Sequence, residues 1–116
     1  MPSRIEALQA RRAAERRAQA LPRAVAALDA LAALGVDAGV IGSLARDRML
    51  DHSDVDFLVL DEAGVDSDAI TALVERQMRP LPVDVVTMRR VSPVDRHIWL
   101  KDLRRADELR AFLAAT

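Results

Sequence analysis

The chain has 116 residues, a formal net charge of −1, 51% hydrophobic residues and 30% charged residues, which is typical of a single folded domain and excludes a disordered chain. It contains no cysteine and no tyrosine, and two phenylalanines and one tryptophan are its only aromatic residues; this excludes disulfides and thiolate catalysis, and we expect no direct nucleic-acid binding because stacking platforms are missing. No apolar run is long enough to cross a bilayer and the start lacks a signal-peptide pattern, so we expect a cytoplasmic protein with no membrane contact.

The first third of the chain is rich in strong helix formers, and only Pro22 interrupts them. This segment predicts two helices, or one helix with a kink, with a cap at Ser3 and an end at Gly35. Six arginines against two glutamates give residues 1–23 a charge of +4, so the other 93 residues sum to −5. We interpret residues 1–21 as an Arg-rich N-terminal helix, either a solvated face or a partner-binding arm, and residues 22–116 as the main domain.

Three short apolar runs predict β-strands, at residues 38–41, 55–60 and 83–87. The second run is apolar on both faces except for its carboxylates and is therefore expected in the middle of a sheet. Helical segments are predicted between and after the strands, at residues 44–50, 66–78 and 93–113. We expect His97 and Trp99 to pack or cap within the last of these helices. The alternation predicts an α/β fold in which helices flank a small sheet.

Three aspartates lie in or beside the predicted strands. Asp54 and Asp56 are two residues apart on one strand, so their carboxylates point the same way and repel unless a cation lies between them. Two aspartates suit Mg²⁺, which fills its remaining positions with water and substrate phosphates. Asp84 lies among β-branched residues, and an aspartate in a central strand needs a partner. If the two strands are neighbours, the three carboxylates could hold two metal ions.

A Gly-Ser turn follows the first predicted strand. Gly42 lets the backbone approach a ligand closely, and Ser43 adds a hydroxyl at the start of a helical turn, which suits phosphate binding. Arg46 and Arg48 could contact a triphosphate, although a solvated pair on a short helix explains them equally well. These residues and the acidic group together suggest transfer of part of a nucleoside triphosphate.

The spacing of these motifs resembles the signature of the polymerase-β-type nucleotidyltransferase superfamily. Gly42-Ser43, ten further residues, Asp54-Val55-Asp56 and a later strand aspartate, Asp84, carry the resemblance. More narrowly, the chain is similar to the minimal nucleotidyltransferase (MNT) domains over roughly residues 28–87. The resemblance implies a polymerase-β-like nucleotidyltransferase fold, a small mixed sheet flanked by helices, and Mg²⁺-dependent transfer of AMP from ATP to a hydroxyl group.

The same resemblance implies roles for individual residues. Gly42 and Ser43 would bind the triphosphate of ATP. Asp54 and Asp56 would ligate both metal ions, while Asp84 would ligate the catalytic ion and help to deprotonate the acceptor hydroxyl.

Many stand-alone MNT proteins are antitoxins that pair with a helical HEPN ribonuclease toxin, and a toxin tyrosine accepts the AMP. The resemblance therefore implies a type VII-like antitoxin, and since this chain has no tyrosine, such an acceptor must be another molecule. Two alternatives stay open. One is a non-catalytic antitoxin that neutralises its toxin by binding, and the other is a nucleotidyltransferase for small molecules of the aminoglycoside type.

Overall fold

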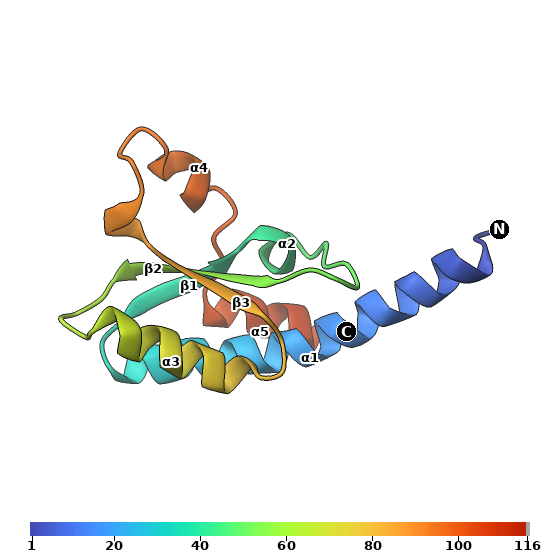
Figure 1. Ribbon diagram of the computed structural model, residues 1–116, viewed down its shortest axis with the longest axis horizontal. Coiled ribbons are helices and arrows are strands. Elements are labelled where there is room, and N and C mark those ends of the chain that lie inside the picture. Colours follow the sequence, from blue (N-terminus) through green and yellow to red (C-terminus); the bar gives the residue numbers. More distant parts are fainter. Residues whose placement is uncertain (116) are drawn as a thin grey trace.

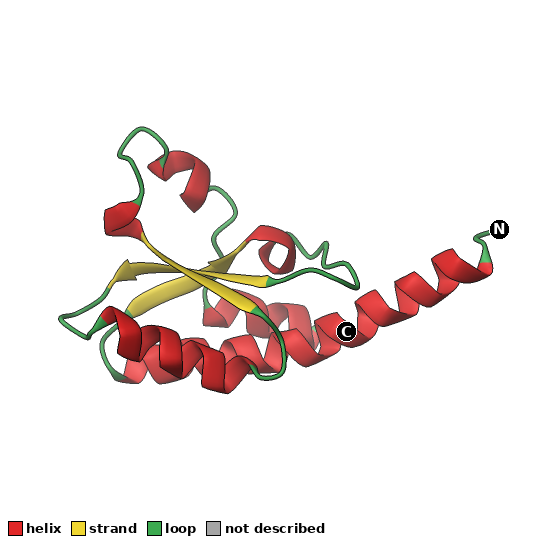
Figure 2. Cartoon of the chain, viewed as in Figure 1, coloured by secondary structure: helices red, strands yellow, loops and turns green. Residues whose placement is uncertain are grey.

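A three-stranded sheet in the order β1–β2–β3 forms the centre of the structure (Figures 1 and 2). The structure is a computed structural model and describes residues 1–115. Its strands are β1 (Asp37–Ile41), β2 (Val55–Asp61) and β3 (Val83–Thr87). β1 is antiparallel to β2, and β3 is parallel to β2. All three strands begin and end within one residue of the predicted bounds, and β2 is central as expected. The predicted mixed α/β architecture is confirmed.

Three helices cover one face of the sheet, and a short helix lies on the other side (Figure 1). The first group is α1 (Arg4–Ala33), α3 (Ser67–Met78) and α5 (Ala106–Ala114), and the short helix is α4 (Arg96–Leu100). On β2 the residues Val55, Phe57 and Val59 alternate toward the first group and are buried in the main apolar core. The residues between them, Asp56 and Leu58, therefore point to the opposite face of the sheet.

Helix α1 is continuous over 30 residues, with Pro22 inside it. Ser3 Oγ accepts a hydrogen bond from the Glu6 amide at 3.1 Å, which confirms the predicted cap. Leu21 and Ala24, on either side of the exposed proline, are fully buried, so packing maintains the helix where a proline would otherwise end it. The chain leaves the helix at Gly35, whose φ of +81° suits glycine.

The N-terminal part of α1 extends away from the rest of the molecule (Figure 1). Residues 1–12 are all exposed, whereas the later turns carry the buried residues of the helix. The division between residues 1–21 and 22–116 stays a prediction, and one helix runs across it. Within the described residues, no helix combines the length and the apolar character that spanning a membrane requires.

The single helical segment predicted at residues 93–113 is wrong. The structure has α4 and α5, separated by an extended segment in which Arg104 exchanges two backbone hydrogen bonds with Val40 of β1, at 2.8 and 2.9 Å. A Cβ atom on Gly39 would lie 2.7 Å from Leu103 Cδ1 and from the Arg104 carbonyl oxygen. The free edge of β1 and the missing side chain at Gly39 therefore favour strand pairing over helix here.

Candidate active site

Asp56 and Asp84 lie opposite each other on neighbouring parallel strands. They are Cα partners in the register of β2 and β3, and partners in such a pair point to the same face of the sheet. Because Val55 and Phe57 point to the helix-covered core, the two carboxylates point to the opposite face. Asp56 is half-buried and Asp84 is exposed. The expectation that Asp84 lies in a central strand is wrong, since β3 is an edge strand, and this explains how an aspartate is tolerated among valines.

Asp54 differs from this pair in its placement. It is exposed and lies one residue before the start of β2, so no strand pairing fixes the direction of its side chain. Its negative charge nevertheless acts on Asp56, as described below.

Gly42 brings the Gly-Ser turn against the Asp56 carboxylate. Its φ is +73°, and a Cβ atom on it would lie 2.5 Å from Asp56 Oδ2. Both observations favour glycine, because another residue would strain the backbone and its Cβ atom would displace the carboxylate. Gly42 and Ser43 begin the single helical turn α2 (Gly42–Ala45), whose first residues receive no hydrogen bond from a capping side chain. The turn and Asp56 therefore form one continuous surface.

The pKa of Asp56 is raised above its ordinary value. Burial is the largest cause, repulsion from Asp84 and from Asp54 adds to it, and the positive charge of Arg46 offsets part of it. The half-buried carboxylate is thus within electrostatic reach of three other predicted site residues. A bound cation would relieve this unfavourable charge.

The donor set fits a magnesium ion held by two carboxylates. In the part of the chain that the structure describes, no group of three or more His, Cys, Asp or Glu side chains could hold a metal ion. Mg²⁺, however, is commonly bound through one or two carboxylates, and waters and substrate phosphates complete its coordination. Asp56 and Asp84 meet that requirement, while a three-carboxylate cluster with Asp54 stays a prediction.

The two predicted arginines occupy different positions. Arg46, at the end of α2, forms an ion pair with Asp102 in which Arg46 Nη1 and Asp102 Oδ2 are 3.7 Å apart. Its charge also reaches Asp56. Arg48 is exposed, and no described contact joins its side chain to the carboxylates. The structure therefore places Arg46 close to Asp56, while a contact between Arg48 and the triphosphate stays a prediction.

Comparison with known families supports the chemistry that this geometry suggests. The chain matches the nucleotidyltransferase domain family over residues 21–106. It belongs to that family. The matched range contains all seven predicted site residues, and the family supports a general nucleotidyl-transfer activity. Searches among curated proteins and among solved structures found no match.

Two arginines of α1, which precede the matched range, contact the loop before Asp54, and the sequence analysis did not single them out individually. From α1, Arg16 Nε donates to the Ser53 carbonyl oxygen at 2.7 Å, and Arg17 Nε lies 2.6 Å from Asp47 Oδ1. These contacts hold both ends of the loop that joins α2 to Asp54. Sequence reasoning assigned the arginines only to a basic helix, because partners 30 and 37 residues away leave no local signal.

Trp99 also lies beside the candidate site, which the sequence analysis did not predict. It is half-buried on α4 and lines a cavity with Gly42, Arg46 and Asp102. The prediction that Trp99 packs or caps within one long last helix missed this contact, because that helix is interrupted before α5. His97, on the same short helix, is exposed.

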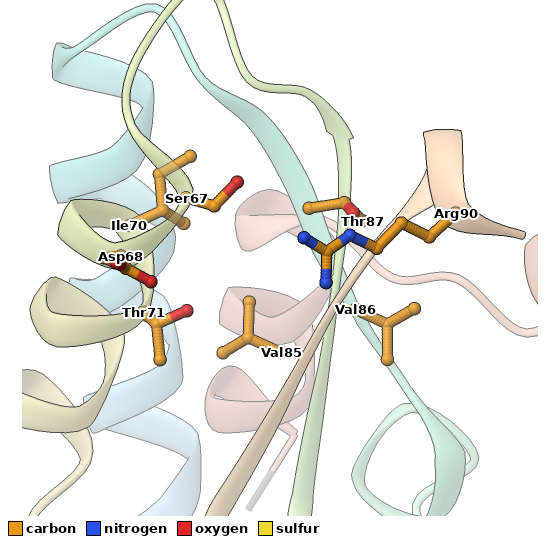
Figure 3. Close-up of a pocket in the computed structure, with 8 residues that line it drawn as sticks. All are labelled: Ser67, Asp68, Ile70, Thr71, Val85, Val86, Thr87 and Arg90. Atoms are coloured by element: carbon orange, nitrogen blue, oxygen red, sulfur yellow. The ribbon is translucent and has the colours of Figure 1, made fainter.

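A separate pocket lies between α3 and β3, away from the predicted site residues (Figure 3). Figure 3 shows Ser67 and Thr71 on the α3 side and Thr87 and Arg90 on the other. Thr87 is 8% exposed, and its hydroxyl has no hydrogen-bond partner among the described residues. None of the predicted site residues lines this pocket, so we do not assign it to the active site of the domain.

Proposed function

We propose that the chain is a Mg²⁺-dependent adenylyltransferase that transfers AMP from ATP to a tyrosine hydroxyl of a HEPN ribonuclease toxin, and so acts as a type VII-like antitoxin. One observation carries the chemical part of the proposal. Asp56 and Asp84 face the same side from adjacent parallel strands, with Gly42 against the Asp56 carboxylate, inside a nucleotidyltransferase domain.

In the proposed reaction Gly42 and Ser43 bind the phosphates of ATP, and Arg46 contributes positive charge nearby. Asp56 and Asp84 would hold the divalent ion, which when bound neutralises phosphate charge and makes the acceptor hydroxyl more acidic. Asp84 takes the hydroxyl proton. The acceptor oxygen forms a bond to the α-phosphorus while the bond from that phosphorus to the bridging oxygen breaks, and pyrophosphate leaves with the electron pair.

The exposure of Asp84 supports a large acceptor. Its strand, β3, is at the edge of the sheet, and its side chain is open to solvent. A tyrosine on the surface of another protein can approach an edge carboxylate without entering a deep cleft. The absence of tyrosine from the chain is consistent with transfer to a different molecule.

The exposed start of α1 is the segment that we propose binds the toxin. Ile5 is 70% exposed and Leu8 43% exposed, which leaves apolar side chains without a core. Arg4 and Arg11 are exposed on the same segment and give it a positive charge. An acidic, partly apolar surface on the partner would complement this segment.

The test uses as acceptor a candidate HEPN ribonuclease, sought first in the reading frame next to the one that encodes this chain. Purified chain, Mg²⁺, α-labelled ATP and that protein are mixed, and label on each protein is measured. We expect label on the partner, and its rate should fall at least about 10³-fold in Asp56→Asn, because the lost carboxylate contributes several kcal/mol to the transition state. Asp68→Asn, an exposed carboxylate on α3, should keep the wild-type rate. Equal labelling by wild type and Asp56→Asn would contradict the proposal.

A binding-only antitoxin is the second candidate, and the exposed apolar side chains of Ile5 and Leu8 at the start of α1 favour it, because they offer a surface that can bind a partner without any chemistry. Asp56→Asn separates the two functions when growth is measured in cells that express the toxin. Loss of protection in this variant supports catalysis. Full protection by a variant that no longer transfers AMP supports neutralisation by binding.

A further inference from the structure

A cavity of about 200 Å³ adjoins the candidate active site on the side of α4. Its lining residues come from the end of β1, from α2 and from the region of α4: Ile41, Gly42, Arg46, Ile98, Trp99 and Asp102. Ile41 is the register partner of Asp56, and Gly42 touches the Asp56 carboxylate. The cavity and the carboxylate pair therefore share a wall, so one ligand can reach both.

The lining combines an aromatic ring, aliphatic side chains and a pair of opposite charges. Trp99 is half-buried, and Ile98, next to it on α4, is 60% exposed, so both side chains offer apolar surface to a ligand in the cavity. A flat heterocycle stacks well on an indole ring. This composition favours an aromatic ligand that also carries hydrogen-bond donors.

Asp102 and Arg46 provide the polar part of the cavity. Their charged groups are 3.7 Å apart, and the side chains are 38% and 52% exposed. At that distance the pair is not a close hydrogen bond, so the Asp102 carboxylate keeps the capacity to accept another donor. An exocyclic amino group of a nucleobase is such a donor.

We propose that this cavity binds the base of the nucleoside triphosphate, with the ring stacked on Trp99 and its amino group donating to Asp102. The inference rests on the proposed nucleotidyl transfer and adds the residues that select the base. Asp102 then favours adenine over hypoxanthine, which carries an oxygen in place of the amino group. Arg46 remains free to turn toward the phosphates when Asp102 receives the base.

Trp99 reports directly on this site because it is the only tryptophan in the chain. The first experiment titrates the protein with MgATP and follows tryptophan emission and heat of binding in parallel. We expect quenching with the same midpoint in both signals. Inorganic tripolyphosphate, which has no base, should give heat without quenching.

Variants test each residue separately. Trp99→Ala should weaken ATP binding about tenfold or more, as expected for the loss of one stacked base, while Trp99→Phe should retain most of the affinity. Leu100→Ala is the matched control, since Leu100 is the next residue of α4 and is 42% exposed without lining the cavity. Binding to these variants is measured by calorimetry.

In the wild type, we expect ATP to bind about tenfold more tightly than inosine triphosphate, because one hydrogen bond contributes about that ratio of affinities. Asp102→Ala should reduce the ratio to about one. Release of Arg46 affects both nucleotides equally, so the ratio isolates the contact with the base. If ATP binds by calorimetry while Trp99 emission and Trp99→Ala affinity are unchanged, the inference is overturned and the proposed function stands. If neither ATP nor tripolyphosphate binds, both are overturned.

Discussion

The two faces of the sheet differ in what covers them. Against α1 and α3, the strand β2 presents Val55, Phe57 and Val59, all buried. One residue out of phase, the same strand presents the half-buried Asp56 and then the fully buried Leu58. A strand seven residues long thus provides apolar packing on one face and a charged site on the other. The comparison shows that a strand whose helix-covered face is entirely apolar can carry a half-buried carboxylate on its opposite face.

Phe57→Ala should have the largest effect on stability. The side chain is fully buried, and truncation of a core phenylalanine costs about 3–5 kcal/mol of unfolding free energy. Urea unfolding followed by circular dichroism measures this loss. Asp56→Asn, one residue away on the other face, should leave the protein folded. If both variants lose a similar amount of unfolding free energy, the helix-covered face is not the main source of stability in β2.

Gly42→Ala should have the next largest effect. Alanine at φ +73° costs about 1–2 kcal/mol, and its Cβ must also displace the Asp56 carboxylate. Gly64→Ala is a matched control, because Gly64 has φ +75° but open space where the Cβ would lie. Unfolding free energies and AMP transfer are measured for both. We expect transfer to fall only in Gly42→Ala, and a normal rate in that variant would contradict the role of the contact.

Thr87→Val should stabilise the protein by about 1 kcal/mol, because the change removes a buried hydroxyl that lacks a hydrogen bond and nearly conserves shape. The control is Thr71→Val, which changes a half-buried threonine on the α3 side of the same pocket. The urea concentrations at the unfolding midpoints of the two variants are compared with that of the wild type, and only Thr87→Val should have a higher midpoint. A loss of stability in Thr87→Val would show that its hydroxyl has a partner in solution.

The smallest expected effect is a pH-dependent gain in Asp56→Asn. The folded pKa of Asp56 is raised by burial and by Asp84 and Asp54, so the fold loses stability as the pH rises from the ordinary aspartate pKa through the raised one. Below the ordinary aspartate range the carboxyl is protonated in both states and the penalty is absent. The unfolding free energy of Asp56→Asn minus that of wild type, measured in EDTA, should therefore increase with pH. A difference that stays constant with pH would contradict the raised pKa.

Much of the fold could be predicted because local patterns determine it. A short run that is apolar on both faces except for its carboxylates predicts β2 in the middle of the sheet, while Gly42 and Pro82 mark the end of β1 and the start of β3. The contact between Gly42 and Asp56 was not predictable, since it depends on the register of β1 against β2. The division between α4 and α5 was also missed, because the helical periodicity does not reveal that Arg104 pairs with the edge of β1.

The unbroken course of α1 has a mechanical consequence. Helix α1 carries the exposed Ile5 and Leu8 near its start. Further along, it carries Arg16 and Arg17, whose side chains contact the loop leading to Asp54. In the proposed antitoxin, a partner bound at Ile5 and Leu8 would therefore be connected through one helix to the loop that precedes Asp54. Partner binding and AMP transfer would then be coupled through α1.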